Sequence, residues 1–260
     1  MVGQLEASRQ CLQIYRETGD RNTEAIALET VGVSWLNMGD LVQARRDLEA
    51  AVSLLRACGN RHVEGRSLSL SAVVALLQGD PTRALPLAVM ARQIAKAGQA
   101  RANEVLATMQ VAGAELALGR LAEARQTYSQ ALQQALAMGD SQRYDASAGL
   151  VRVELAEGDV GAALVALQPL LDHVAAGGSL RNTQERDIEL TCHRALARAG
   201  DPRAADWLAR AHTALMDGAA TITDDALRQG FLQNVQDHRE IVAAWAKRDV
   251  SSESAARNVG

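Results

Sequence analysis

Glycine recurs about every 20 residues along most of the chain, usually followed by a polar or helix-capping residue. The ten pairs are Gly19-Asp20, Gly39-Asp40, Gly59-Asn60, Gly79-Asp80, Gly98-Gln99, Gly119-Arg120, Gly139-Asp140, Gly158-Asp159, Gly177-Gly178 and Gly200-Asp201. Between them, apolar residues lie three and four apart, and no stretch shows the alternation typical of a strand. Each interval therefore predicts one helix, and the chain as a whole predicts an all-α fold.

Each glycine is expected to end a helix, because glycine takes the left-handed conformation at a helix C-terminus without steric cost. The next residue is expected to begin another helix. Asp40, Asp80, Asp159 and Asp201 can accept hydrogen bonds from free N–H groups of the first turn, and Asp40 with Gln43 has capping-box spacing. Turns this short make consecutive helices antiparallel, so the sequence predicts a row of helical hairpins.

Alanine follows five residues after every other glycine of this series. These alanines are Ala44, Ala84, Ala124, Ala163 and Ala205. Seven residues further on come Ala51, Ala91 and Ala131, which lie on the same helical face as the first three. Small side chains at these positions are expected to let the second helix of each hairpin approach its partner closely.

One hairpin combines these small residues with larger ones in a known pattern. The residues are Val31, Gly32, Trp35, Ala44, Leu48 and Ala51, and together they resemble a tetratricopeptide repeat. Later hairpins keep the second-helix pattern better than the first-helix one. The period near 40 exceeds the usual value of about 34 residues, which implies helices about one turn longer. The resemblance covers roughly residues 5–217 and implies a right-handed α-solenoid of antiparallel hairpins.

The long period is similar to that of the repeat arrays in bacterial signalling ATPases, transcriptional activators and cyclase-linked regulators. Residues 1–20 are predicted to form a single helix, an incomplete leading hairpin, followed by five helix pairs over residues 21–217. The pairs are 21–59, 60–98, 99–139, 140–178 and 179–217. Because the array opens on what resembles a second helix, the chain is expected to be a piece of a longer protein. The alternative is that the single helix is itself the cap.

Residues 218–248 are predicted to be C-terminal capping helices, and residues 249–260 a disordered tail. The capping segment resembles the one that closes such arrays in the same regulators. Its apolar residues are expected to seal the last hairpin: Leu227, Phe231, Leu232, Val235, Ile241, Val242 and Trp245.

The charge of the chain narrows the classes of partner. A net charge of −4 and a pI near 5.8 disfavour nucleic-acid binding, because phosphate contacts need a basic surface. No stretch approaches the roughly 20 apolar residues that span a bilayer, so we expect a cytoplasmic protein without membrane contact.

The cysteines Cys11, Cys58 and Cys192 are far apart and odd in number, which predicts buried thiols rather than disulfides.

No motif for catalysis, metal binding or cofactor binding emerges. The five histidines are scattered, none has HExxH spacing, and no glycine-rich phosphate loop is present, so we expect no metal, no cofactor and no enzyme activity. Glu115 and Glu154 occupy equivalent sites in successive units and could form an acid/base pair. The alternative, which we favour, is that each pairs with an arginine of a neighbouring helix or reaches solvent.

The concave surface of such an array is expected to be lined by the first helix of each hairpin. Seven residues are predicted to face this groove and contact a partner: Glu29, Arg66, Ser69, Met109, Arg152, Arg186 and Glu189. They lie among apolar Val33, Leu36, Val73, Leu76, Leu106 and Leu116. Because arginine can grip a carboxylate with two N–H groups, such a groove suits a helix, an extended peptide or a carboxylate ligand. The alternative is that these groups are solvated or paired within the array.

Two functions follow as hypotheses. The first is a non-catalytic scaffold that docks a protein or peptide partner, or linked N-terminal domains of a bacterial signalling or transcription regulator. The second is an effector-sensing domain in which a small ligand controls a linked ATPase, cyclase or transcription factor.

Overall fold

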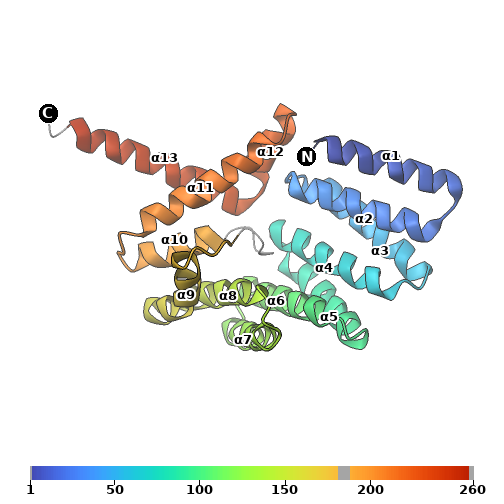
Figure 1. The fold of residues 1–260 in the computed structure, drawn as a ribbon, viewed down its shortest axis with the longest axis horizontal. Coiled ribbons are helices and arrows are strands. Elements are labelled where there is room, and N and C mark those ends of the chain that lie inside the picture. The colour runs from blue at the N-terminus through green and yellow to red at the C-terminus, as the bar shows by residue number, and fades with distance from the viewer. Residues whose placement is uncertain (1, 181–187, 258–260) are drawn as a thin grey trace.

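The computed structural model describes residues 2–180 and 188–257, and within these residues it is helical with no strand. The helices are α1 Val2–Thr18, α2 Arg21–Asn37, α3 Leu41–Ala57, α4 Arg61–Leu77, α5 Pro81–Ala97, α6 Arg101–Ala117, α7 Leu121–Met138, α8 Gln142–Glu157, α9 Val160–Ala175, α10 Ile188–Arg198, α11 Ala204–Ala220, α12 Asp225–Asn234 and α13 Gln236–Arg257. Figure 1 shows them as antiparallel neighbours that follow one another around an arc. The predicted all-α, hairpin-based architecture is confirmed.

The helix boundaries follow the glycine series. Nine of the ten glycines have positive φ, as a left-handed helix end requires. The exception is Gly98, whose φ is −83°, because the neighbouring Gln99 takes the left-handed conformation with φ 54°. The next helix, α6, then begins after Ala100, which offers no side-chain cap, whereas Asp80 caps α5 by accepting from the N–H of Arg83.

Small residues allow the close helix packing that the alanine pattern predicts. Ala44, Ala84, Ala124 and Ala163 are fully buried. The fifth alanine, Ala205, is exposed, and the expectation for it was wrong. In the last pair the buried alanine is Ala204, which follows its glycine by four residues rather than five. The helix α11 also starts at Ala204, whereas α3 starts only two residues after its glycine.

The first helices of the hairpins form the inner layer of the arc. The first helix of each hairpin packs against the first helix of a neighbouring hairpin, which holds for α2, α4, α6, α8 and α10. The second helices of neighbouring hairpins contact one another far less. In a curved stack, the helices nearer the centre of curvature lie closer together. The first helices therefore line the concave side, as the sequence predicted.

The C-terminal helices reach back to the start of the array. Asn234 Nδ2 of α12 donates to the carbonyl oxygen of Gly39 at 3.2 Å, in the turn between α2 and α3. A Cβ added at Gly39 would lie 2.8 Å from the Cα of Phe231. Phe231 is buried in the same cluster as Met38 and Leu41 of the first hairpin. Figure 1 shows α12 beside this end of α2, so the arc closes on itself.

This closure changes the predicted role of the capping segment. The segment was expected to seal the last hairpin, but Phe231 packs against both Gly218 of α11 and Gly39 of the first hairpin. Arg194 of α10 holds α13, because its guanidinium donates to Asp237 at 2.6 Å and to Glu240 at 2.7 Å and 2.8 Å. Two boundaries also differ from the prediction: α11 continues past residue 217 to Ala220, and α13 extends to Arg257, where a disordered tail was expected from residue 249.

Candidate binding groove and rim pocket

A stripe of partly exposed side chains runs across the first helices. On α4 it consists of Arg66, Leu70 and Val73, which are spaced four and three residues apart. We call the stripe the inner row, and it comprises Ile26, Thr30 and Val33 of α2, Arg66, Leu70 and Val73 of α4, and Leu106 and Gly113 of α6. The other sides of these helices pack against α1, α3, α5, α7 and one another. The inner row is thus the side of the first helices that remains open toward the centre of the arc.

Glu29 and Arg66, two of the predicted groove residues, form an ion pair with each other. Glu29 is buried, with 4% of the residue exposed, and its carboxylate accepts from Arg66 Nη2 at 2.6 Å and Nε at 2.7 Å. The hydroxyl of Ser67 donates to the second carboxylate oxygen. A buried carboxylate needs such partners, so Glu29 joins α2 to α4 inside the array and does not face the groove. Arg66 remains on the surface, with 47% of its side chain exposed.

Two further groove predictions fall in buried positions. Ser69 is 5% exposed, and its hydroxyl donates to Gln110 Oε1 of α6 at 2.5 Å. Met109 is 4% exposed and belongs to the core between α6, α7 and α8, so its prediction as a partner contact was wrong. Met109 lies three residues from Leu106 and on the side of α6 that packs against its neighbours. Helical periodicity cannot distinguish an apolar core residue from an apolar groove residue when the groove itself is apolar.

Arg152 of α8 lies over Tyr128 of α7. Its Nη2 donates to the Tyr128 hydroxyl at 3.0 Å, and its guanidinium carbon is 5.9 Å from the ring centroid. Gly149 makes room for this tyrosine, because a Cβ there would lie 2.1 Å from Tyr128 Cε1. Of the other two predicted residues, Glu189 is half-buried on α10, and Arg186 lies outside the described residues.

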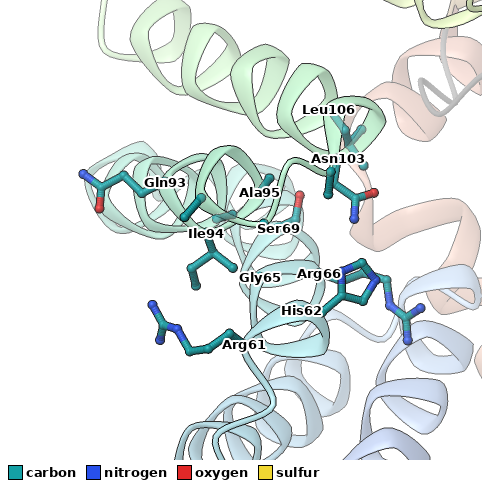
Figure 2. A pocket seen from close by; sticks show the side chains of 14 residues that line it. Arg61, His62, Gly65, Arg66, Ser69, Gln93, Ile94, Ala95, Asn103 and Leu106 are labelled. Carbon is teal, nitrogen blue, oxygen red and sulfur yellow. The ribbon is translucent and has the colours of Figure 1, made fainter.

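A pocket of about 480 Å³ opens at the rim of the inner row. It lies between the first half of α4, the end of α5 and the first turns of α6. In Figure 2, His62 and Arg66 point to one side of α4, where Asn103 of α6 also lies, and Arg61 points to the other side. We call it the rim pocket, and it is lined by Arg61, His62, Gly65, Arg66, Ser69, Ala91, Gln93, Ile94, Ala95, Ala97, Gly98, Ala100, Asn103 and Leu106. Arg66 and Ser69, predicted from the sequence, therefore meet here.

Leu106 was also expected among the apolar residues of the groove, and the other lining residues were missed at the sequence level. One signal marks their place: the Gly98-Gln99 turn departs from the Gly-Asp or Gly-Asn pattern of the turns before it. The rim pocket lies against this turn, where Gly98 and Ala100 belong to its lining. In this chain, the departure from the repeat at Gly98-Gln99 coincides with the rim pocket.

The two carboxylates considered for acid/base chemistry are arranged differently from each other. Glu154 pairs with an arginine of the preceding helix, since Arg125 donates to it at 2.7 Å and 2.9 Å and also reaches Glu157. These hydrogen bonds, to Glu154 first, raise the pKa of Arg125. The Oε2 atom of Glu115 is buried without a hydrogen-bond partner. The pairing alternative is therefore confirmed for Glu154 but not for Glu115.

Other chemical features are sparse in the part of the chain that the structure describes. No cluster of three or more histidine, cysteine or acidic side chains is arranged to hold a metal there. Cys192 is buried, and this burial, with the charge of Glu189, raises the pKa of its thiol. Cys11 and Cys58 are exposed, so burial was predicted correctly only for Cys192. No helix among the described residues is both long and apolar enough to cross a membrane.

Solved structures share this fold. The apo form of RapI matches 95% of this chain and 70% of its own length, with a TM-score of 0.65 and 15% identity. A Rap protein complexed with competence and sporulation factor matches 95% of this chain and 72% of its own, with a TM-score of 0.66 and 12% identity. The fold is that of a tetratricopeptide-like repeat array.

A third structure supports the same conclusion for the repeats alone. A putative kinesin light chain of Podosopora anserina with nearly identical TPR-like repeats covers 76% of this chain and 96% of its own, with a TM-score of 0.53 and 16% identity. No protein-family model and no curated protein sequence matches the chain. These likenesses concern the fold, and the function has to be argued from the surface.

Proposed function

We propose that this TPR-like array is a non-catalytic interaction module that binds a partner polypeptide along its inner row. One observation carries the proposal: the first helices keep an open, largely apolar stripe that ends on the exposed guanidinium of Arg66. An extended or helical polypeptide can cover such a stripe with alternate side chains while its polar groups meet the flanking residues. Leu70 and Val73 supply the apolar part of that contact.

The setting of this module is part of the proposal. Long-period arrays of this kind occur in bacterial signalling ATPases, transcriptional activators and cyclase-linked regulators, as the sequence resemblance implies. A Rap protein of similar fold is complexed with competence and sporulation factor, which supports a binding role for the architecture. We extend the proposal to a partner polypeptide that belongs to such a regulator, or to domains linked to this chain.

A photo-crosslinking experiment tests the inner row. A benzoylphenylalanine placed at Thr30, an exposed residue of the inner row, should crosslink to a recurring polypeptide segment in cell extract, identified by mass spectrometry. The same residue placed at Ser53, exposed on the outer helix α3, is the matched control and should not label that segment. Equal labelling from both positions, or none from Thr30, contradicts the proposal.

A small effector is a second candidate, and the rim pocket favours it. Its volume of about 480 Å³ lies within the range of small-molecule sites, about 300 to 1,000 Å³. In that case a metabolite panel should raise the melting temperature of the isolated chain, because a ligand that binds only the folded state stabilises it. A panel without any shift counts against this second function and leaves the first untouched.

A further inference from the structure

The rim pocket lies at one end of the inner row and shares residues with it. Arg66 of α4 and Leu106 of α6 belong to both, and they occupy equivalent places 40 residues apart. A polypeptide that follows the inner row therefore meets the pocket without leaving the surface of the first helices. This continuity makes a side chain of the bound polypeptide the nearest candidate to enter it.

The charged side chains in the pocket lining are the two arginines, and the carboxylates that pair with them, Glu29 and Glu64, lie outside the lining. Arg61, His62 and Arg66 contribute to the lining, and the lining as described contains no acidic residue. This contrasts with the chain as a whole, which carries a net charge of −4. The guanidinium groups of this lining can bind an anion of the ligand through the N–H donors that their carboxylate partners leave unused.

The two arginines are held in place by acidic residues behind them. Arg66 reaches Glu29 through Nε and Nη2, and Arg61 reaches the buried Glu64 through Nη1 at 2.5 Å. Each of these carboxylates has a second donor, Ser67 for Glu29 and Arg56 for Glu64. A guanidinium has five N–H donors, so both arginines keep donors beyond those used for anchoring. Anchored arginines lose less conformational entropy when they bind an anion.

The inner wall of the pocket is apolar. Ile94 and Leu106 provide branched aliphatic side chains, and Ala91 and Ala95 leave the space between them open. Asn103 and Gln93 add amide groups that can donate to an oxygen atom or accept from a peptide N–H. The combination matches an aliphatic group beside a carboxylate.

We propose that the rim pocket binds an aspartate or glutamate side chain of the partner polypeptide, with a neighbouring aliphatic side chain against Ile94 and Leu106. This inference rests on the proposed function, because it takes the occupant to be part of a polypeptide on the inner row. It assigns an acidic-aliphatic pair as the specificity element of that polypeptide.

The first part of the test uses a peptide library as the probe. A positional-scanning library of acetylated, amidated heptapeptides is passed over the immobilised full chain, with glutamate or glutamine fixed at each position in turn. We expect pools with glutamate next to leucine, isoleucine or valine to be retained at least about tenfold more than their glutamine counterparts, the ratio that 1.4 kcal/mol gives. Retention without an acidic preference would overturn the inference while leaving polypeptide binding in place.

The second part uses two matched variants. Ala97→Glu adds a carboxylate to the pocket lining at an exposed position, where it repels the ligand and competes for the same basic groups. Ala57→Glu is the control, because Ala57 is the exposed last residue of α3, one hairpin earlier, and lies outside the pocket. With the best glutamate heptapeptide, Ala97→Glu should weaken binding about tenfold or more by calorimetry, and Ala57→Glu should leave it unchanged.

The glutamine form of that peptide should bind wild type and the Ala97→Glu variant equally, because glutamine carries no charge that the added carboxylate could repel. Equal affinities of the two variants for the glutamate peptide would overturn the inference. A different result bears on the proposed function itself: if no peptide pool is retained but glutarate alone raises the melting temperature of wild type and not of Ala97→Glu, the pocket belongs to a free carboxylate. Matching thermal melts of the unliganded variants establish that both are folded.

Discussion

The first three hairpins, α2–α7, and the C-terminal helices, α10–α13, are built by different means. In the hairpins, helices of 17 or 18 residues repeat with left-handed turns and buried alanines at regular places. At the C-terminal end the helices α11, α12 and α13 have 17, 10 and 22 residues, and the buried alanine moves to Ala204. The hairpins form the curve, whereas the C-terminal helices close it through contacts that occur once.

This difference bears on how a substitution in each region affects the molecule. A substitution in a repeated contact between sequence neighbours alters one of several equivalent interfaces. The contact between α12 and the first hairpin has no equivalent, and the rim pocket also lies at an irregular turn. A single substitution at the α12 contact or at the rim pocket should therefore have an effect that substitutions at the repeated positions do not have.

The strongest test of this comparison uses two glycines with the same backbone conformation. Gly39 and Gly79 have φ 73° and 74°, but only Gly39 contacts α12, while nothing lies within 4 Å of a Cβ at Gly79. Gly79→Ala should cost about 1 to 2 kcal/mol for the left-handed conformation alone. Gly39→Ala should cost about 1 to 3 kcal/mol more, because its Cβ overlaps the backbone of Phe231.

Denaturant unfolding measures both free energies, and small-angle scattering measures the shape. We expect the Gly39→Ala variant alone to have a larger radius of gyration, because its arc opens. Equal destabilisation and unchanged scattering for both variants would mean that the contact with α12 contributes nothing to closure.

The second test concerns the alanine positions. Ala124→Leu places a larger side chain in a fully buried site between α6 and α7 and should destabilise by about 2 kcal/mol. Ala205→Leu follows its glycine by the same five residues but lies on an exposed surface, so it should change stability by less than about 0.5 kcal/mol. Thermal and denaturant unfolding compare the two. Similar losses would show that the last pair keeps the register of the others.

The smallest effect is expected from a helix cap. Hydrogen bonds from the Thr82 hydroxyl and then from the Arg83 N–H lower the pKa of Asp80 below its usual 3.8. A group with a lowered folded-state pKa stabilises above its unfolded pKa and loses this contribution as pH falls through the folded value. The loss of stability that results from protonation of Asp80 should thus occur below about pH 4.

Asp80→Asn keeps a capping side chain but removes the titration. The melting temperature of the variant should equal that of wild type at pH 7 and fall less steeply between pH 4 and pH 2. Parallel melting curves over this range would contradict a role for the ionised carboxylate at the start of α5.

The sequence predicts the repeated part of the molecule because its determinants are local. A glycine such as Gly79 and the Asp80 after it define a turn from within a few residues, and the alanine five residues on defines the packing face. Closure could not be predicted in this way, because Gly39 and Asn234 are 195 residues apart and belong to no pattern. The extension of α13 to Arg257 could not be predicted either, because the sequence there shows no helix cap and no apolar periodicity.

The site was predicted in part for the same reason. Helical periodicity predicted an exposed Arg66 on α4, and 47% of its side chain is exposed in the structure. It could not show that Glu29 is buried, since the burial depends on Arg66 and Ser67 from another hairpin. It also could not separate Met109 from the groove, because core and groove are both apolar here.

The contact of α12 with the first hairpin has a consequence for how the array unfolds. An open row of repeats has two free ends, and its terminal units can melt before the middle does. Here α12 also contacts the first hairpin, so the described part of the array has an additional interface between its two ends. Melting that starts at either end then breaks this interface as well, and the array should be lost in one cooperative transition instead of shortening from its ends.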